Sequence, residues 1–204
     1  MGDLRDHWEG IYASRAGTDV SWYQPHAARS LATITTAADK AAPIIDIGGG
    51  ASTLVDDLLA HGYSDLTVLD MAERALAKSK VRLGAKASRV AWIVADITQW
   101  QPPRRYQVWH DRAVFHFLTA PEQQAAYVAA LNAGTLPGAT VAMATFALDG
   151  PEKCSGLSVQ RYSPLTLAAR LGSPFVLAQE AQETHTTPWG AGQRFSYAVF
   201  RREA

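Results

Sequence analysis

The chain has 204 residues, of which 48% are apolar, so it is long and apolar enough for one globular domain with a substantial core. Its 19 basic and 19 acidic residues leave no formal net charge, which argues against a broad basic surface for nucleic acid. Cys154 is the only cysteine, so no internal disulfide forms, and no apolar run has the length of a membrane span or an N-terminal signal segment. These features predict a cytoplasmic protein, a monomer or weak homodimer, without nucleic-acid or membrane partners.

Aromatic residues gather near the N-terminus, in and just after a first predicted helix over residues 4–13. Trp8 and Tyr12 recur there at helical spacing, and Trp22 follows in a predicted loop before a second helix over 26–38. These side chains have two interpretations. They either pack the first helix onto the rest of the domain, or they form a lid over a cationic ligand, because ring faces attract cations.

Residues 43–52 are typical of a buried strand, a glycine turn and the start of a helix. The isoleucines early in this stretch are β-branched, as in a parallel strand that is buried on both faces. Gly48 and Gly50 allow a positive φ and let the backbone approach a ligand closely. Ser52 or Thr53 is expected to cap the helix that follows. Alone, such a unit has low specificity, because it binds dinucleotides and many other ligands.

Three acidic residues stand at the ends of three successive predicted strands. Asp46 ends the first strand, Asp70 ends a strand over 66–69, and Asp96 follows one over 90–95. A carboxylate at Asp46 would repel the pyrophosphate of a dinucleotide and would suit an amino group. Asp70 lies where a ribose diol is held in such folds. Together the acids predict a ligand with an amino group, a ribose and an adenine but no phosphate, which describes S-adenosylmethionine.

Strands and helices alternate through the middle of the chain. Helices are predicted over 72–83 and 120–133, and further strands over 106–110 and 139–147. This alternation predicts an α/β fold with a doubly wound, mostly parallel sheet and right-handed crossovers. In such a sheet ligands bind beyond the carboxyl ends of the strands, where the three acids lie.

The last part of the chain follows a different pattern. Residues 148–162 are long and irregular, which is typical of a loop over a site, and Ser163-Pro164 begin a short helix. Two more strands are predicted over 175–184 and 193–202. The loop that joins them begins at His185.

The glycine turn resembles the acid-x-Gly-x-Gly-x-Gly signature of the class I S-adenosylmethionine-dependent methyltransferases. Here it reads Asp46-Ile47-Gly48-Gly49-Gly50-Ala51-Ser52, with serine in place of the last glycine. The later motifs of that family are resembled, in order and spacing, by Asp70, by Ala95-Asp96-Ile97 and by His110-Asp111-Arg112. The resemblance is good over about residues 40–147 and looser at the ends. Its motifs are specific together, although none is specific alone.

A finer resemblance points to the thiopurine methyltransferase-like, small-molecule branch of the family. It is carried by the triplet Asp111-Arg112-Ala113 and by the aromatic residues ahead of the first strand. The family implies a seven-stranded Rossmann-like methyltransferase sheet whose last strand is antiparallel and inserted into the sheet. It also implies one methyltransferase domain over 1–204. Within it we expect a helical lid over the cofactor (1–40), a cofactor-binding core (41–147), and an acceptor loop, helix and terminal β-hairpin (148–204).

The resemblance implies S-adenosyl-L-methionine as the cofactor, bound by the lid, the glycine turn and the strand ends. The residues expected to bind it are Tyr12, Trp22, Tyr23, Asp46, Gly48, Gly49, Gly50, Ser52, Asp70, Met71, Asp96, Ile97, His110 and Asp111. No histidine, cysteine or acid spacing resembles a zinc site, so we expect no metal.

The candidates for catalysis and acceptor binding are His185, His116, Arg112 and Cys154. Methyl transfer mainly requires alignment of the acceptor lone pair, the methyl carbon and the sulfur, and a base only where the acceptor carries a proton. His185 is expected to be exposed on a rim loop, where it could serve as that base. Arg112 either holds an anionic acceptor or pairs with Asp111. His116, between two phenylalanines, is more typical of a structural histidine.

We therefore predict a methyltransferase that acts on a small molecule, with a thiol, selenol or nitrogen acceptor favoured. One alternative is a protein-lysine methyltransferase, although that branch more often has lysine at the position of Arg112. Less favoured alternatives are a nicotinamide-dependent reductase, against which Asp46 argues, and a noncatalytic cofactor-binding module.

Overall fold

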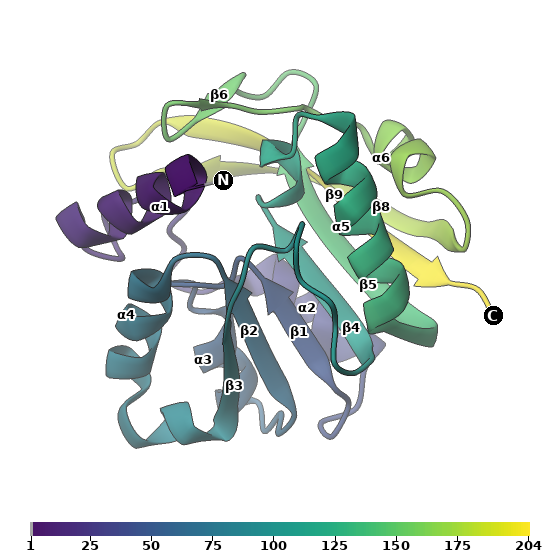
Figure 1. Ribbon diagram of the computed structural model, residues 1–204, viewed down its shortest axis with the longest axis horizontal. Helices are drawn as coiled ribbons and strands as arrows, with labels where there is room; N and C mark the ends of the chain where they lie inside the picture. The colour runs from purple at the N-terminus through teal and green to yellow at the C-terminus, as the bar shows by residue number, and fades with distance from the viewer. Residues whose placement is uncertain (1) are drawn as a thin grey trace.

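A seven-stranded sheet crosses the molecule, with helices on both of its faces (Figure 1). The computed structural model describes residues 2–204, and the strands lie in the order β3-β2-β1-β4-β5-β9-β8. They are β1 (Ile44–Ile47), β2 (Leu66–Asp70), β3 (Val90–Val94), β4 (Tyr106–Arg112), β5 (Thr135–Phe146), β8 (Phe175–Thr186) and β9 (Gly192–Arg202). β9 lies between β5 and β8 and is antiparallel to both, whereas β1 to β5 pair in parallel. The predicted doubly wound sheet with an inserted antiparallel last strand is confirmed.

The helices cover the sheet in two layers. They are α1 (Gly2–Ser14), α2 (Ala28–Ala37), α3 (Leu54–Ala60), α4 (Glu73–Leu83), α5 (Pro121–Gly134) and α6 (Pro164–Leu171), with short 3₁₀ helices η1 (Gly84–Arg89) and η2 (Phe115–Phe117). Side chains of α2, α3 and α4 form one buried cluster with β1 and β2, and those of α5 and α6 form another on the opposite face. Of the helices in the described part of the chain, none combines the length and the apolar character needed to cross a membrane.

Two fully buried strands, β1 and β2, explain why the polar site forms at one edge of the sheet. Every residue of β1 and β2 is buried, so most of their positions are apolar. Asp46 lies beside Val68 on one neighbouring strand and beside His110 on the other. Because these strands are parallel, their last residues meet at the same edge, and the polar side chains of Asp46, Asp70 and His110 gather there.

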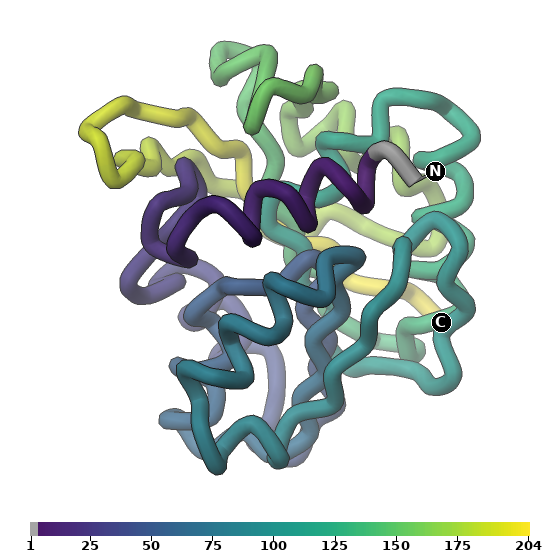
Figure 2. Tube along the Cα trace, turned by 60° about the vertical axis from the view of Figure 1, so that its left-hand side comes forward, coloured from purple at the N-terminus to yellow at the C-terminus, as the bar shows by residue number. Residues whose placement is uncertain are grey.

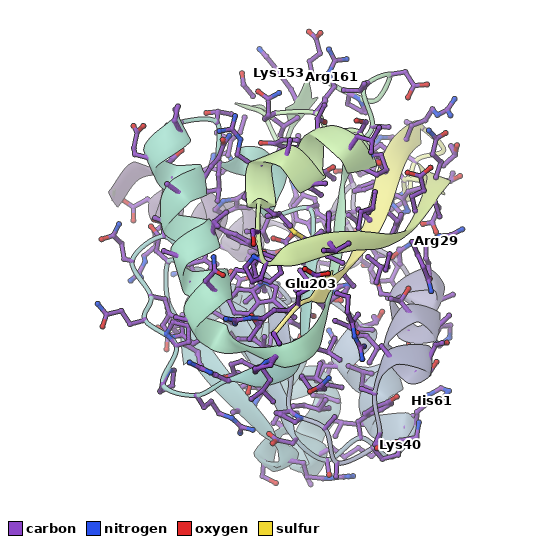
Figure 3. The ribbon with its side chains drawn as sticks, turned by 90° about the vertical axis from the view of Figure 1, so that its right-hand side faces the viewer. Arg29, Lys40, His61, Lys153, Arg161 and Glu203 are labelled. Carbon is purple, nitrogen blue, oxygen red and sulfur yellow. The ribbon has the colours of Figure 1, made fainter. Side chains whose placement is uncertain are left out.

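Two segments outside the main layers lie at this carboxyl edge. α1 crosses the strand ends, and the short hairpin β6 (Lys153–Cys154) and β7 (Leu157–Ser158) lies above β5 and β9 (Figures 1 and 2). Figure 3 shows Lys153 and Arg161 at that end of the molecule and Lys40 and His61 at the other. The N-terminal helix and the hairpin therefore frame the edge where ligands bind in sheets of this kind.

Two strands are longer than the sequence pattern predicts. β5 begins at Thr135 and not at 139, because Gly138 continues the chain with φ +73° while the partner strand shifts register between Tyr106 and Val108. β8 continues through Thr186, so His185 is a paired strand residue. The prediction that the connecting loop begins at His185 is therefore wrong.

Candidate cofactor and acceptor site

Two connected clefts open at the carboxyl edge of the sheet, and a wider, more open hollow beside Arg5 and Trp100 adjoins the larger of them. The large cleft contains about 860 Å³ of space, and its walls include Trp8, Asp70, Met71, Asp96, Ile97, Phe117 and Cys154. The small cleft contains about 540 Å³, and its walls include Tyr23, Ser30, Asp46, Gly49, Ser52 and His110. Both are lined by Tyr12, Trp22, Ile47, Gly48 and Arg112. These shared residues mark the junction of the two clefts.

The glycine turn forms the floor of this junction. Gly48 has φ +66°, and a β-carbon there would overlap the side chain of Val114. A β-carbon at Gly49 would overlap a carboxylate oxygen of Asp46. Ser52 accepts a hydrogen bond from the backbone N–H of Leu54 at 3.1 Å, so it satisfies the start of α3 as predicted. The turn thus leaves room for a ligand and for the acid beneath it.

Asp46 belongs to a buried chain of three polar side chains. Its Oδ1 lies 2.6 Å from Nδ1 of His110, and Nε2 of His110 lies 2.8 Å from Oγ of Ser30 on α2. All three residues are buried, and Oδ2 of Asp46 has no hydrogen-bond partner among the described residues. A buried carboxylate oxygen without a donor costs free energy. A ligand amino group in the small cleft would supply that donor.

Asp70 provides a second acid, in the large cleft. Its side chain is 8% exposed, and its Oδ1 accepts the backbone N–H of Ala72 at 2.8 Å. Burial raises the pKa of Asp70 to about 7, and the nearby charge of Asp46 adds to the rise. Two hydroxyl donors would stabilise the charged form. Asp70 therefore fits a ribose diol.

Asp96 and Ile97 continue the same wall of the large cleft. Oδ1 of Asp96 accepts both the N–H and the hydroxyl of Thr98, at 2.9 and 2.8 Å, which fixes the loop after β3. Ile97 is buried and contributes an apolar surface beside it. A flat ring with polar edges, such as adenine, matches an apolar wall next to a carboxylate.

The N-terminal aromatic residues cover both clefts. Trp22 makes edge-to-face contacts with Trp8 and Tyr12, at ring separations of 5.6 and 6.3 Å. α1 is fastened by Glu9, whose carboxylate accepts the N–H of Glu73 at 2.6 Å at the start of α4. The aromatic rings therefore lie where the lid was predicted, over the clefts, and they also pack against one another.

Arg112 enters the junction from the end of β4. Its Nη1 donates to the carbonyl oxygen of Trp22 at 3.1 Å, and its Nε donates to the hydroxyl of Tyr197 at 3.3 Å. The guanidinium lies over the ring of Phe195, 4.5 Å from its centre. Nη2 is buried and has no partner among the described residues.

The other candidate acceptor residues are less accessible than the sequence suggests. Cys154 lines the large cleft, and burial raises the pKa of its thiol. His185 is only 5% exposed, and its Nε2 lies 2.7 Å from the carbonyl oxygen of Ser21, so its predicted exposure is wrong. His116 is fully buried, and burial together with the charge of Arg112 lowers its pKa to about 3. Neither histidine lines a cleft.

The prediction that Asp111 binds the cofactor also needs correction, because this residue lines neither cleft. Alternation along β4 places it on the face opposite to His110 and Arg112. There its Oδ2 accepts the hydroxyl of Tyr127 at 2.6 Å, and its carboxylate also accepts the N–H of Val114 at 2.9 Å. Burial raises the pKa of Asp111 to about 6. Asp111 therefore holds the turn after β4, and the alternative that it pairs with Arg112 is not found.

Gly50 also lies outside the cleft walls. A β-carbon there would overlap the carboxylate of Asp70 and the side chain of Ala75. Gly50 thus allows α4 and Asp70 to approach the glycine turn. Two polar residues with site contacts, Glu9 and Ser30, were not predicted from the sequence, because each acts on a partner more than 60 residues away.

Comparison with known proteins identifies the central segment. Residues 44–134 match the family described as "Methyltransferase domain". This segment is therefore similar to methyltransferase domains. Over 98% of the chain, the fold is similar to an S-adenosylmethionine-dependent methyltransferase from Anabaena variabilis (TM-score 0.77, 13% identity, 95% of that chain covered). It is also similar to the crystal structure of Burkholderia thailandensis 1,6-didemethyltoxoflavin-N1-methyltransferase with bound 1,6-didemethyltoxoflavin and S-adenosylhomocysteine (TM-score 0.74, 18% identity, 88% of that chain covered).

Curated relatives also match by sequence, and two of them differ in the acceptor that their names give. The malonyl-[acyl-carrier protein] O-methyltransferase of Anoxybacillus flavithermus is 35% identical over 88 residues, which are 42% of this chain. The eEF1A lysine and N-terminal methyltransferase of Mus musculus is 25% identical over 122 residues, which are 58% of this chain. The chain spans 33% and 17% of the length of these relatives.

The chain thus has the Rossmann-like methyltransferase fold that the motifs implied, and residues 44–134 match a methyltransferase domain. The unsatisfied oxygen of Asp46 and the raised pKa of Asp70 fit the amino group and the ribose of S-adenosylmethionine, the cofactor that the motifs predict. The narrower resemblance to the thiopurine methyltransferase-like branch stays a prediction.

Proposed function

We propose that the protein transfers a methyl group from S-adenosylmethionine to a small-molecule acceptor. The observation that carries this proposal is the large cleft beneath the aromatic lid, which continues past the proposed cofactor residues Asp70 and Ile97 to walls formed by Arg112, Phe117 and Cys154. A cleft with apolar walls and a few polar groups is typical of small-ligand sites. The cofactor supplies an electrophilic methyl group on a sulfonium.

In this proposal the site has two halves with separate tasks. Asp46, Asp70 and Ile97 form the cofactor half, and Arg112, Phe117 and Cys154 form the acceptor half. Asp70 would hold the ribose, Asp46 the amino group, and Ile97 the adenine. The aromatic lid, the N-terminal part of the proposed domain division, would exclude water and accommodate the positive sulfonium. The acceptor would enter between the turn after β4 and the β6–β7 hairpin and be aligned by the walls for in-line displacement.

The test is a screen of metabolites for S-adenosylhomocysteine production by the purified protein. We expect production that depends on one class of small molecule. A rise in melting temperature with S-adenosylmethionine and S-adenosylhomocysteine, but not with NAD, should accompany it, because a ligand at about 100 times its Kd adds about 2.7 kcal/mol to stability. No thermal shift with either sulfur ligand at saturation would contradict the proposal.

A protein-lysine acceptor is the second candidate, favoured by the 25% identity over 122 residues to the mouse eEF1A lysine and N-terminal methyltransferase. Incubating cell lysate with methyl-labelled cofactor separates the two. Label in small molecules alone favours our proposal, whereas label in protein bands that depends on added enzyme favours the lysine acceptor.

A further inference from the structure

Arg112 is a partly buried cation that forms no ion pair with a described carboxylate. Several other arginines form ion pairs: Arg29 with Glu183, Arg82 with Asp56, and Arg161 with Glu152 (Arg29 and Arg161 are labelled in Figure 3). Among the described residues, Arg112 has no carboxylate within 4.0 Å, and its buried Nη2 has no partner. Glu183 is linked to it only through the hydroxyl of Tyr197, which lies 3.5 Å from the Glu183 carboxylate. An enclosed charge without a counter-charge is costly, so an anion from outside the chain would stabilise it.

The charge of Arg112 acts on the acceptor half of the site. It lowers the pKa values of His116, His185 and Cys154, although burial outweighs it and raises the pKa of the thiol. The causes that shift the pKa of Asp70 on the cofactor side do not include it. Arg112 also lines both clefts, so it lies at their junction. An anion bound there would lie between the guanidinium and the sulfonium and be attracted by both.

Among the residues whose side chains are described, none in the acceptor half of the site is placed to remove a proton from an acceptor. His116 and His185 line neither cleft, and the raised pKa of Cys154 keeps its thiol protonated near neutral pH. The remaining acids of the large cleft, Asp70 and Asp96, lie at the ends of β2 and β3 on the cofactor side. An amine or alcohol that must lose a proton on methylation would find no base there.

We propose that the acceptor is an organic acid, an acidic thiol or a carboxylic acid, which enters already ionised and whose negative charge is received by Arg112. This inference rests on the proposed function. The lone pair of the anionic sulfur or oxygen forms a bond to the methyl carbon, while the bond from that carbon to the cofactor sulfur breaks and leaves its electron pair on sulfur. Anion and sulfonium become two neutral products, and no proton moves. The product has then lost the charge that held it at Arg112, which favours its release.

Binding is the first test, because it needs no knowledge of the natural acceptor. The protein is saturated with S-adenosylhomocysteine and titrated with benzoate or its neutral isostere benzamide, and with acetate or acetamide, while tryptophan fluorescence is followed. We expect each anion to bind about tenfold more tightly than its isostere or better. Arg112→Met should remove the preference, and Arg112→Lys should keep part of it. Arg104→Met, which removes a charge at the other end of β4, is the matched control and should keep all of it.

Turnover is the second test, with thiophenol, phenol and aniline as acceptors at about pH 7.5, where only the thiol is largely ionised. We expect S-adenosylhomocysteine production with thiophenol above the other two, and a loss of about tenfold or more in kcat/KM in Arg112→Met. Affinity for S-adenosylhomocysteine should stay within about twofold of the parent.

Several outcomes would overturn the inference. They are equal binding of anions and isosteres, faster methylation of aniline than of thiophenol, or the same loss in Arg104→Met as in Arg112→Met. A loss of S-adenosylhomocysteine binding in Arg112→Met would also overturn it, because Arg112 would then hold the carboxylate of the cofactor. Failure of the parent protein to bind S-adenosylhomocysteine would instead contradict the proposed function, so the two failures are distinguishable.

Discussion

The cofactor half and the acceptor half of this site are built in opposite ways. In the cofactor half, Asp46 and Asp70 are single residues at the ends of neighbouring buried strands, and each acid has one oxygen fixed by a nearby group. In the acceptor half, Arg112 is held by Trp22 and Tyr197, which are 90 and 85 residues away in the chain. The first half therefore has two buried acids that need donors from a ligand, and the second has a cation that needs an anion.

This difference fits what each half has to bind, a constant cofactor in one and the acceptor in the other. A cofactor that is always the same molecule suits a rigid set of strand ends, whose geometry the sheet fixes. The acceptor half instead draws on a connection outside the main sheet, the β6–β7 hairpin, which contributes Cys154 to the large cleft. The following predictions test whether the halves are energetically as separate as they are in space.

The largest effect is expected for Asp70→Ala, which removes the proposed ribose ligand. Affinity for S-adenosylhomocysteine should fall by about 1.5–3 kcal/mol, the usual contribution of hydrogen bonds to a charged group, or about 10- to 150-fold. Isothermal titration calorimetry would measure it. Asp65→Ala, which removes an acid that pairs with Arg104 at the opposite edge, is the control and should change the affinity little. Unchanged binding in Asp70→Ala would mean that another residue holds the ribose.

The pH dependence of binding is the next effect in size. The pKa of Asp70 in the free protein is raised to about 7, and hydroxyl donors favour its charged form. Binding must therefore release a proton below about pH 7, so affinity for S-adenosylhomocysteine should rise from about pH 5.5 to 7 and then level off. Asp70→Asn should bind more weakly and without this slope. A slope that persists in Asp70→Asn would assign it to another group.

The same raised pKa has a consequence for the free protein. The unfolded chain ionises Asp70 near its ordinary pKa of 3.8, whereas the folded chain keeps the proton up to about pH 7. Between these values the folded state binds more protons than the unfolded state, so this group costs stability as the pH rises. Asp70→Asn should therefore have a higher melting temperature than the parent at about pH 8, with a smaller difference at about pH 4.

How much of each half could be predicted from the sequence follows from the range of its contacts. Asp46, Asp70 and Asp96 could be placed because strand period and chain order alone bring them to one edge. Asp111 was misassigned, although strict alternation from Arg112 would have placed it on the opposite face. The exposure of His185 was misjudged because two strands paired further than their composition suggested. Glu9 and Ser30 have no local signal, since their partners are set by how α1 and α2 pack.

A smaller effect is expected in the buried chain from Asp46 to Ser30. His110→Asn shortens the side chain that fixes the carboxylate of Asp46. It should weaken the binding free energy for S-adenosylhomocysteine by about 1–2 kcal/mol, which raises the Kd by about 5- to 30-fold. Ser30→Ala should do the same more weakly. The control is a ligand, 5′-methylthioadenosine, which keeps the adenosine and the sulfur but lacks the amino group. Its affinity should stay within about twofold, whereas an equal loss for both ligands would show a general disturbance of the fold.

The smallest effect is expected at the lid, and it separates the two interpretations of the N-terminal aromatics. If the ring of Trp22 faces the sulfonium, Trp22→Ala should weaken the binding of the cationic S-adenosylmethionine more than the binding of the neutral S-adenosylhomocysteine. The difference should be about 0.5–1 kcal/mol, the usual size of an exposed cation–π contact. Trp22→Phe should retain most of the difference. Trp189→Ala, at a tryptophan that is 60% exposed on the β8–β9 turn, is the control and should affect neither ligand. If Trp22 only packs α1, both ligands should weaken together and the melting temperature of the free protein should fall, because Trp22 contacts Trp8 and Tyr12 whether or not a ligand is bound.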